Sequence, residues 1–367
     1  MNHHCDHCGT SIGFKGICWK CQSEQDRNEV LAWTKEQIAS KIQQLIAHVD
    51  RLEDWDTDEY EMCCNLLEVH GMYPPALQRV AVEAKVFSLE RLYYQAPADV
   101  RDRLIISLVE ATDPREASEL MCCLAMQGDD QALETLLELE RNPQPWRAQL
   151  YANPSVYAQV AGWTFDQEGN RRELNYATCY AMEKSDNRAD TAATIGRLRE
   201  DSCPHCGCPL VDMLMLDGRD ERLQFLGIDG IFTATCCPNC CCYSEAVFSR
   251  FTRDGGSTPV FPYNELIDDL ENYIEEDTLK ALCSNSYRLE KTPVPLFYGA
   301  GSEDLNTIGG FASWVQDAQY ITCPDCSQPM KYVAQIQWDT VMEYSEGTLY
   351  IEVCPDCSIA SMHHQQT

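Results

Sequence analysis

The chain has 367 residues, of which 58 are acidic and 28 basic, so its formal net charge at pH 7 is −30. This length suits two or three domains with buried cores. The charge argues against nucleic acid and anionic membrane surfaces as partners, because proteins bind both mainly through Lys and Arg. The sequence holds no run of about 18 apolar residues and no apolar stretch near its start, so we predict neither a membrane span nor a secretion signal.

Cysteine is the most informative residue type, with 22 copies. Without a secretion signal we expect the cytoplasm, where clustered thiols bind metal rather than form disulfides. Twelve cysteines form six Cys-x-x-Cys pairs, and two such pairs can close a tetrahedral thiolate site that has no open position for catalysis. We therefore predict three structural zinc sites, with the ligand sets Cys5, Cys8, Cys18 and Cys21; Cys203, Cys206, Cys237 and Cys240; and Cys323, Cys326, Cys354 and Cys357.

The first site has its two pairs nine residues apart, a gap that suits a tight hairpin. A redox role is disfavoured, because neither pair is expected to begin a helix after a strand, where a thiolate would be stabilised. His3, His4 and His7 lie beside this site and are possible substitute ligands, although four thiols suffice.

The second and third sites lie in an internal duplication. C-P-H-C-G-C-P-L from Cys203 matches C-P-D-C-S-Q-P-M from Cys323, and a second C-P-x-C follows 34 and 31 residues after the first cysteine, respectively. Strand-like runs separate the pairs, for example MKYVAQIQW at 330–338, so we predict two zinc-ribbon-like modules. In the middle site the ligand choice stays open, because further cysteines crowd the pairs, namely Cys208, Cys236, Cys241 and Cys242.

The remaining cysteines lie outside these pairs, and two doublets among them fall in apolar helical patterns. We interpret them as small buried apolar residues rather than reactive thiols. They are Cys63, Cys64, Cys122, Cys123, Cys179 and Cys283.

Helical periodicity dominates the first half of the chain. Residues 34–54 place apolar side chains on one face, and Thr34 with Gln37 forms a possible capping box. Short links join further predicted helices, which resemble an irregular HEAT-like stack of the kind that usually binds partners. These helices are predicted over 58–70, 75–95, 98–111, 114–127 and 130–141.

Aromatic residues and turn pairs follow, with a hairpin turn predicted at Asp166–Asn170. Residues 264–277 contain seven acidic residues and no basic one, and Leu266, Ile267, Leu270 and Ile274 keep helical spacing, so we predict an acidic amphipathic helix. A second acidic cluster, residues 50–61, has seven acids and Arg51. Each is either a solvated face or a docking surface for a basic protein.

Together these patterns predict an α+β protein. The expected parts are an N-terminal zinc knuckle (1–23), a HEAT-like helical domain (24–145), a mixed region with the middle zinc module (146–262), an acidic helix and connector (263–310) and a C-terminal zinc module (311–367).

Catalytic motifs are missing from the sequence: it has no H-E-x-x-H, no G-x-x-x-x-G-K-[ST], no G-x-S-x-G and no G-x-G-x-x-G after a strand. We therefore expect a binding protein rather than an enzyme. Zinc ribbons often bind nucleic acid, but residues 311–367 have one Lys against seven acidic residues, and each tetrathiolate zinc site adds a formal charge of about −2. This charge again disfavours nucleic acid.

The stretch IGGFASWVQDAQYITCPDCSQPMKYVAQI (308–336), followed by EGTLYIEVCPDC and a terminal QQT, resembles the C-terminal signature of the bacterial YwqG-like family. The wider resemblance covers about residues 110–367. Ala312 stands where the family usually has proline, and Ser327 where it usually has glycine. The family's zinc ligands correspond to Cys323, Cys326, Cys354 and Cys357.

Members of this family are often encoded beside polymorphic toxins of the Rhs or contact-dependent kind, including type VI secretion systems. The resemblance thus implies a cytoplasmic immunity protein that occludes a cognate, basic toxin domain, and it identifies no contact residue. Two alternatives are a zinc-stabilised interaction scaffold unrelated to toxins and an enzyme that reverses a toxin's modification. The toxin's chemistry and the oligomeric state do not follow from the sequence.

Overall fold

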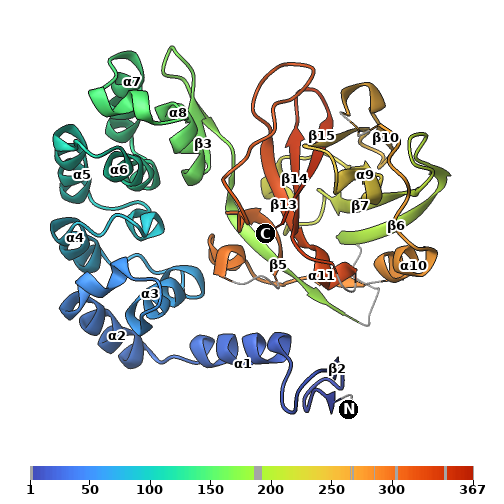
Figure 1. Ribbon diagram of the computed structural model, residues 1–367, viewed down its shortest axis with the longest axis horizontal. Helices are drawn as coiled ribbons and strands as arrows, with labels where there is room; N and C mark the ends of the chain where they lie inside the picture. The colour runs from blue at the N-terminus through green and yellow to red at the C-terminus, as the bar shows by residue number, and fades with distance from the viewer. Residues whose placement is uncertain are drawn as a thin grey trace. The chain divides into compact units, whose positions relative to one another are not determined.

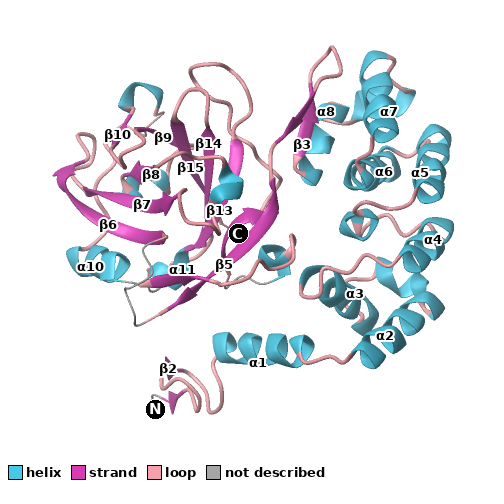
Figure 2. Cartoon of the chain, turned by 180° about the vertical axis from the view of Figure 1, so that it is seen from behind, coloured by secondary structure: helices cyan, strands magenta, loops and turns pink. Residues whose placement is uncertain are grey.

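The computed structural model describes residues 3–185, 192–264, 266, 268–284, 286–301, 305–342 and 345–366. The chain divides into two compact units, Met1–Thr135 with Pro143–Tyr151, and Leu136–Asn142 with Ala152–Thr367. The first unit is mainly helical and the second is rich in strands, which confirms the predicted α+β class (Figures 1 and 2).

The first unit opens with a hairpin of two short strands and continues with a succession of helices (Figure 1). Three 3-10 turns, Val49–Glu53, Glu90–Tyr93 and Pro145–Gln149, belong to the same unit. The elements are β1 (His3–His4), β2 (Ser11–Ile12), α1 (Trp19–Leu31), α2 (Lys35–Ala47), α3 (Asp58–Glu68), α4 (Pro75–Ala84), α5 (Ala98–Glu110) and α6 (Pro114–Gln127), followed by α7 (Asp130–Arg141) at the boundary between the units.

Local sequence signals place several helix ends correctly. The predicted capping box is formed: the Gln37 amide donates to the Thr34 hydroxyl at 3.2 Å, and the Thr34 amide donates to the Gln37 side chain at 2.7 Å. Two predicted helices are too long. α2 ends at Ala47, and α4 ends at Ala84 because Lys85 has a φ of 61°, a left-handed conformation that stops a helix.

The second unit contains an eight-stranded antiparallel sheet in the order β10-β9-β15-β14-β13-β12-β5-β11 and a three-stranded sheet in the order β6-β7-β8. The hairpin β3–β4 forms at the predicted Asp166–Asn170 turn. The strands are β3 (Trp163–Phe165), β4 (Arg171–Glu173), β5 (Tyr176–Lys184), β6 (Ala193–Ser202), β7 (Pro209–Asp217), β8 (Ile231–Cys236), β9 (Val247–Phe251), β10 (Ser257–Pro259), β11 (Tyr287–Leu289), β12 (Asn306–Gly310), β13 (Lys331–Gln337), β14 (Thr348–Cys354) and β15 (Ile359–Gln365), and the helices are α8 (Pro154–Tyr157), α9 (Pro238–Cys241), α10 (Glu276–Ser284) and α11 (Trp338–Val341).

The internal duplication has the same strand order in both copies. The first copy runs β6, knuckle, β7, β8, knuckle, β9, and the second runs β12, knuckle, β13, β14, knuckle, β15. The final strands of the two copies pair with each other, with Met362 opposite Val247 and Ile359 opposite Arg250. The eight-stranded sheet therefore joins the two modules through equivalent strands.

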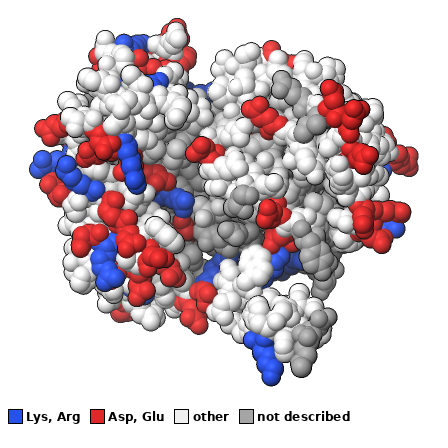
Figure 3. Space-filling model, in the orientation of Figure 1, with Lys and Arg blue, Asp and Glu red and all other residues white. Residues whose placement is uncertain are grey.

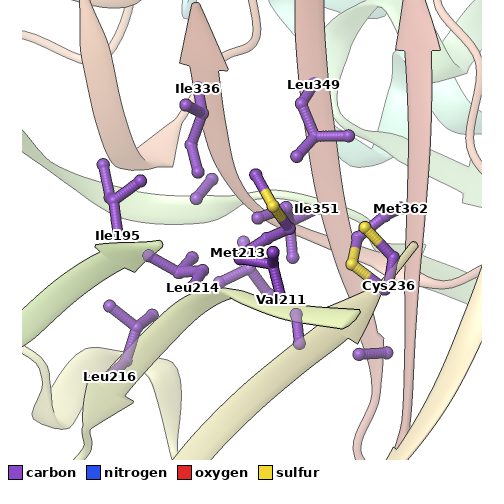
Figure 4. Close-up of a cluster of buried hydrophobic side chains, with 14 of the residues drawn as sticks. Ile195, Val211, Met213, Leu214, Leu216, Cys236, Ile336, Leu349, Ile351 and Met362 are labelled. Carbon is purple, nitrogen blue, oxygen red and sulfur yellow. The ribbon is translucent and has the colours of Figure 1, made fainter. Parts of the chain in front are cut away.

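The main core lies between the three-stranded sheet and one face of the eight-stranded sheet (Figure 4). Val211, Met213 and Leu214 of β7 face Leu349 and Ile351 of β14, and all five side chains are fully buried. Full burial of an aliphatic side chain stabilises a fold by about 1.5–3 kcal/mol, so this interface holds the two sheets together.

The opposite face of β13, β14 and β15 is polar although it is buried. Strand register places its side chains in three rows: Ser361, Glu352 and Tyr332; His363, Tyr350 and Gln335; and Gln365, Thr348 and Gln337. All nine residues are at most 4% exposed. Because most buried polar groups have hydrogen-bond partners, part of this face is expected to bind backbone groups of another segment.

A strap formed by residues 311–321, the centre of the family-like signature, covers this polar face. Its backbone amides donate to sheet side chains, from Ser313 to Gln335 at 2.8 Å, Val315 to Tyr350 at 3.0 Å, Gln316 to Gln365 at 3.1 Å and Ile321 to Glu352 at 2.9 Å. The two glycines before the strap, Gly309 and Gly310, have φ angles of 73° and 68°. A Cβ atom at Gly309 would lie 2.1 Å from the Thr178 carbonyl oxygen, so the close approach of β5 requires glycine.

The predicted acidic helix over 264–277 is wrong for the described residues. Glu265 and Ile267 lie outside them, and the described residues before Glu276 form turns or irregular structure, so α10 begins at Glu276. Leu266, Leu270 and Ile274 pack against the main core. The side chain of Asn239 binds the backbone of this segment, donating to the Glu271 carbonyl and accepting from the Tyr273 amide, both at 3.0 Å. These tertiary contacts replace local helical hydrogen bonds.

Among the helices of the described chain, none has the length and apolarity required to cross a bilayer.

Candidate metal centres

Each of the three predicted cysteine quartets converges in space. Within each quartet, all four sulfur atoms lie within 4.8 Å of one another. Sulfur–sulfur distances within the quartets are 3.6 Å for Cys8 and Cys18, 3.5 Å for Cys206 and Cys237, and 3.7 Å for Cys326 and Cys354. A tetrahedral zinc site with Zn–S bonds of about 2.3 Å has sulfur–sulfur edges of about 3.8 Å. The donor sets therefore fit a single tetrahedral metal ion each, and no disulfide joins the described cysteines.

The first centre lies in the helical unit and combines a hairpin with a helix start. Cys5 and Cys8 belong to a tight turn in which the Gly9 amide donates to the Cys5 carbonyl at 3.0 Å. Cys18 is the N-cap of α1, and Cys21 lies in its first turn. The expectation that neither pair would begin a helix is therefore wrong. The Cys18 amide donates to the Cys5 sulfur at 3.2 Å, and this hydrogen bond is the main cause that lowers the pKa of Cys5 to about 6.

The convergence of all four thiols favours metal binding over redox chemistry at this centre, whatever the helix position. The histidines nearby stay outside the quartet. His4, for example, contacts the carbonyl oxygen of Gly9 at 3.0 Å through Nδ1.

The middle and third centres share one knuckle geometry. Cys203 and Cys323 each donate an amide hydrogen bond of 2.8 Å to the residue five positions later. The residue after the second cysteine is left-handed in both copies, with a φ of 76° at Gly207 and 59° at Ser327. Glycine adopts this conformation without strain, and Ser327 adopts it with a side chain.

The middle centre resolves the ligand choice that the sequence left open. Cys203, Cys206, Cys237 and Cys240 form the quartet, and Cys240 lies 3.8 Å from Cys203 and 3.6 Å from Cys206. The neighbouring thiols contact backbone carbonyls instead: Cys242 donates to Pro238 at 3.3 Å, Cys208 to Pro209 at 3.6 Å and Cys241 to Met362 at 3.9 Å.

The third centre is supported by a cation that the sequence analysis missed. Arg250 of β9 donates to the Cys357 carbonyl and to Asp325, both at 2.8 Å, and the Tyr263 hydroxyl donates to Asp325 at 2.8 Å. Asp325 is the variable residue of the first C-P-x-C knuckle and Cys357 ends the second, so Arg250 connects the two knuckles of this centre. A guanidinium bound to the Cys357 carbonyl would also offset part of the negative charge of a metal-bound quartet. No local signal could reveal this contact, because 75 residues separate Arg250 from Asp325.

The cysteines outside the quartets behave as the sequence predicted. Cys63, Cys123 and Cys179 are fully buried, and Cys64, Cys122 and Cys283 are partly buried. Burial raises the pKa of Cys64 and of Cys122 to about 12, which keeps both thiols neutral and unreactive near pH 7.

Comparison with known proteins gives one relative. The uncharacterized protein YpfL of Salmonella typhimurium, strain LT2, is 30% identical to the chain over 283 residues, which cover 75% of the chain and 64% of YpfL. The chain thus matches less than two thirds of this relative's length. No protein-family model matches the chain, so the resemblance to the YwqG-like family stays a prediction. No solved structure matches it either.

Proposed function

We propose that the protein is an immunity protein that binds a basic toxin domain through its acidic surface and blocks the toxin's active site or substrate access. The observation that carries this proposal is a group of exposed carboxylates, Asp268, Asp269, Glu271 and Glu275, none of which forms an ion pair within the described chain. In the neighbouring helix α10, by contrast, Lys280 pairs with Glu276 and Asp277. Figure 3 shows the acidic side chains gathered around α10.

Two aromatic rings lie beside these carboxylates. Tyr243 and Tyr273 have ring centroids 6.1 Å apart and are 46% and 63% exposed. An exposed aromatic face attracts Lys and Arg side chains by cation–π interaction, and nearby carboxylates add ion pairs and speed association with a basic partner. The combination suits a segment rich in Lys or Arg.

The middle metal centre holds this surface in place. Asn239 lies between the metal ligands Cys237 and Cys240, is 1% exposed, and binds the backbone at Glu271 and Tyr273. A surface that is rigid before binding loses less conformational entropy when a partner docks. The proposed zinc ion therefore supports binding without taking part in it.

The acidic cluster at residues 50–61 offers a second, separate contact. Glu59 is buried against Arg51 at 3.0 Å, and Glu53 accepts from the Phe87 amide at 2.8 Å, so these two carboxylates have structural roles. Trp55 is 75% exposed among the other acids of the cluster. Exposed tryptophan is a frequent hot spot in protein interfaces.

We assign zinc to the three quartets. Tetrahedral sites of four thiolates are typical of zinc or of iron–sulfur chemistry, and the edge lengths above fit one zinc ion in each. The three ions would be held by twelve cysteines in total, four for each ion, and would supply folding energy rather than a reaction centre.

The test is co-expression with the toxin encoded beside the gene. We expect growth to be restored, protection to require stoichiometric amounts, and a stable complex to be isolated. Protection by catalytic amounts without a complex would favour an enzyme that reverses damage, and a gene with no toxin neighbour would favour a general scaffold. Either result would reject the proposal.

Two variants locate the contact. Glu271→Lys should weaken the complex at least tenfold, because it reverses one charge in the unpaired group. Glu200→Lys makes the same change of net charge on the exposed strand β6 and should leave affinity nearly unchanged. Equal losses for both variants would mean that net charge, and not this surface, governs binding.

A further inference from the structure

A buried histidine lies directly beneath the strap of residues 311–321. His363 is 1% exposed, and neither of its ring nitrogens has a hydrogen-bond partner among the described residues. Its ring stacks on Trp314 of the strap, with centroids 6.0 Å apart and an interplanar angle of 15°, and lies 5.2 Å from the ring of Tyr350. A neutral imidazole leaves one donor and one acceptor unpaired here, whereas an imidazolium would bury a charge and two unpaired donors.

The side chains beside His363 are the ones that hold the centre of the strap. Tyr350 lies opposite His363 in the sheet and accepts a hydrogen bond from the Val315 amide at 3.0 Å. Gln365, two residues further along β15, accepts from the Gln316 amide at 3.1 Å. A change at His363 therefore acts on the attachment of the strap.

The strap is anchored at both ends. Its first residue, Phe311, stacks on Phe297 with ring centroids 4.2 Å apart. Near its other end, the Tyr320 hydroxyl donates to Asn175 at 2.7 Å. The residues between these anchors are less covered, since 313–316 are partly or fully exposed. The centre of the strap can thus lift from the sheet while both ends stay in place.

The duplication shows that a module of this kind folds without a strap. In the first copy, β6 ends at Ser202 and Cys203 follows directly, whereas residues 311–322 separate β12 from Cys323 in the second copy. The first copy still forms its sheet and its cysteine quartet. The strap is therefore an addition that the fold of the module does not require.

The groups that face His363 from the neighbouring elements supply no counter-charge. Burial lowers the pKa of His363 to about 3, and His364, on the other face of β15, lowers it further. Burial also raises the pKa of the Glu352 carboxyl well above its usual range, so this group is neutral near pH 7. The facing side chains are Tyr350, Thr348 and Glu352 from β14, Phe248 from β9 and Trp314 from the strap, whose one acid, Asp317, is exposed.

We propose that the strap is a pH-sensitive lid whose centre lifts from the sheet when His363 takes up a proton from solvent. Protonation turns both ring nitrogens into donors, and water reaches them only when Trp314 moves away. Lifting also breaks the hydrogen bonds between the strap and the side chains of Tyr350 and Gln365, so these polar groups become exposed. The lid is independent of the proposed toxin binding.

The test is amide hydrogen exchange of the full chain at pH 7.5 and 5.5, with each rate divided by the intrinsic rate at that pH. Protection of the Val315 and Gln316 amides should fall about tenfold, because the open form binds a proton with a pKa near 6.5 and the closed form does not. At both pH values it should stay below the protection of the Thr235 amide, which donates to the Ser249 hydroxyl in the first copy and reports global unfolding.

Two variants separate the lid from other effects of acid. His363→Phe should show the same strap protection at both pH values, and His363→Gln, which also lacks a titrating ring, replaces it if the first variant does not fold. His364→Phe makes the matched change on the other face of β15 and should keep the fall of about tenfold.

Three results would overturn the proposal. The first is unchanged protection of the strap amides in the unmodified chain between pH 7.5 and 5.5. The second is a fall of the same size in His363→Phe, which would assign the effect to another group. The third is strap amides as well protected as the Thr235 amide, which would mean that the strap opens only when the whole protein unfolds.

Discussion

Arg250 donates to Asp325 at 2.8 Å and so connects the strand that follows the middle centre to the first knuckle of the third centre. This contact crosses between the two copies of the duplication. It lies at the same point where β9 and β15 pair, since Arg250 is opposite Ile359 in the sheet. The two modules of the duplication thus form one structural unit rather than two independently folded domains.

Arg250→Ala should lower the free energy of unfolding by about 1 kcal/mol, a modest value because the Arg250 side chain is 44% exposed and its ion pair is screened by water. Urea denaturation followed by fluorescence measures this change. Arg253→Ala is the control, since its ion pair with Asp229 is 81% exposed on both sides and should contribute little. A larger loss for Arg253→Ala would contradict the assigned role of Arg250.

The purified protein should contain close to three zinc ions per chain, one for each quartet. Cys323→Ser should lower the content to about two and destabilise the C-terminal module, because structural zinc contributes directly to folding. Elemental analysis checks the content. Cys283→Ser, a partly buried cysteine outside the quartets, should leave the zinc content unchanged.

Ser327→Gly should raise the free energy of unfolding by about 0.5–1 kcal/mol, because Ser327 holds a φ of 59° that glycine adopts without strain. The reverse change in the first copy, Gly207→Ala, should lower it by about 1 kcal/mol at a φ of 76°. Urea denaturation of each variant beside the unmodified protein tests whether the free energy of unfolding rises for Ser327→Gly and falls for Gly207→Ala. Changes of the same sign in the two copies would show that left-handed backbone strain is not the cause.

Glu352→Leu should destabilise the protein by about 2–3 kcal/mol, because it leaves the Ile321 amide without an acceptor beneath the strap. Glu352→Gln keeps an acceptor oxygen and should lose less than half as much. Glu352 is fully buried, and burial raises the pKa of its carboxyl well above the usual range, so the neutral amide is a close mimic. Equal losses of stability for Glu352→Leu and Glu352→Gln would indicate that the hydrogen bond to Ile321 does not hold the strap.

His363 should make stability depend on pH. It is 1% exposed, and burial lowers its pKa to about 3, below the value near 6.5 of the unfolded chain. Between these values the unfolded state binds the extra proton, so stability falls as pH falls from about 6.5 towards 3, by about 2 kcal/mol at pH 5.

His363→Phe removes this dependence and keeps the ring between Trp314, at 6.0 Å, and Tyr350, at 5.2 Å. Neither ring nitrogen of His363 has a hydrogen-bond partner within the described chain, so the variant should be at least as stable at pH 7. Unfolding curves of both proteins from pH 5 to 7 measure the difference, in which effects of the metal sites cancel. A constant difference across this range would contradict the low pKa.

The sequence by itself determined the features that depend on short spacing. Two residues between cysteines bring both sulfurs to one centre, and four copies of C-P-x-C identified the second and third quartets and the duplication. Helices with caps were equally accessible, as the bond between Thr34 and Gln37 shows. In these cases the interacting groups lie within a few residues of one another, so their spacing in the sequence predicts the local structure.

Tertiary structure decided the features that depend on distant contacts. The segment before Glu276 has helical spacing, but Asn239 and the main core bind it in another conformation. Strand register placed Glu352 and His363 under the strap. Hydrogen bonds and apolar contacts between residues tens of positions apart outweigh local secondary-structure propensity. A single sequence does not show which of these distant residues come into contact.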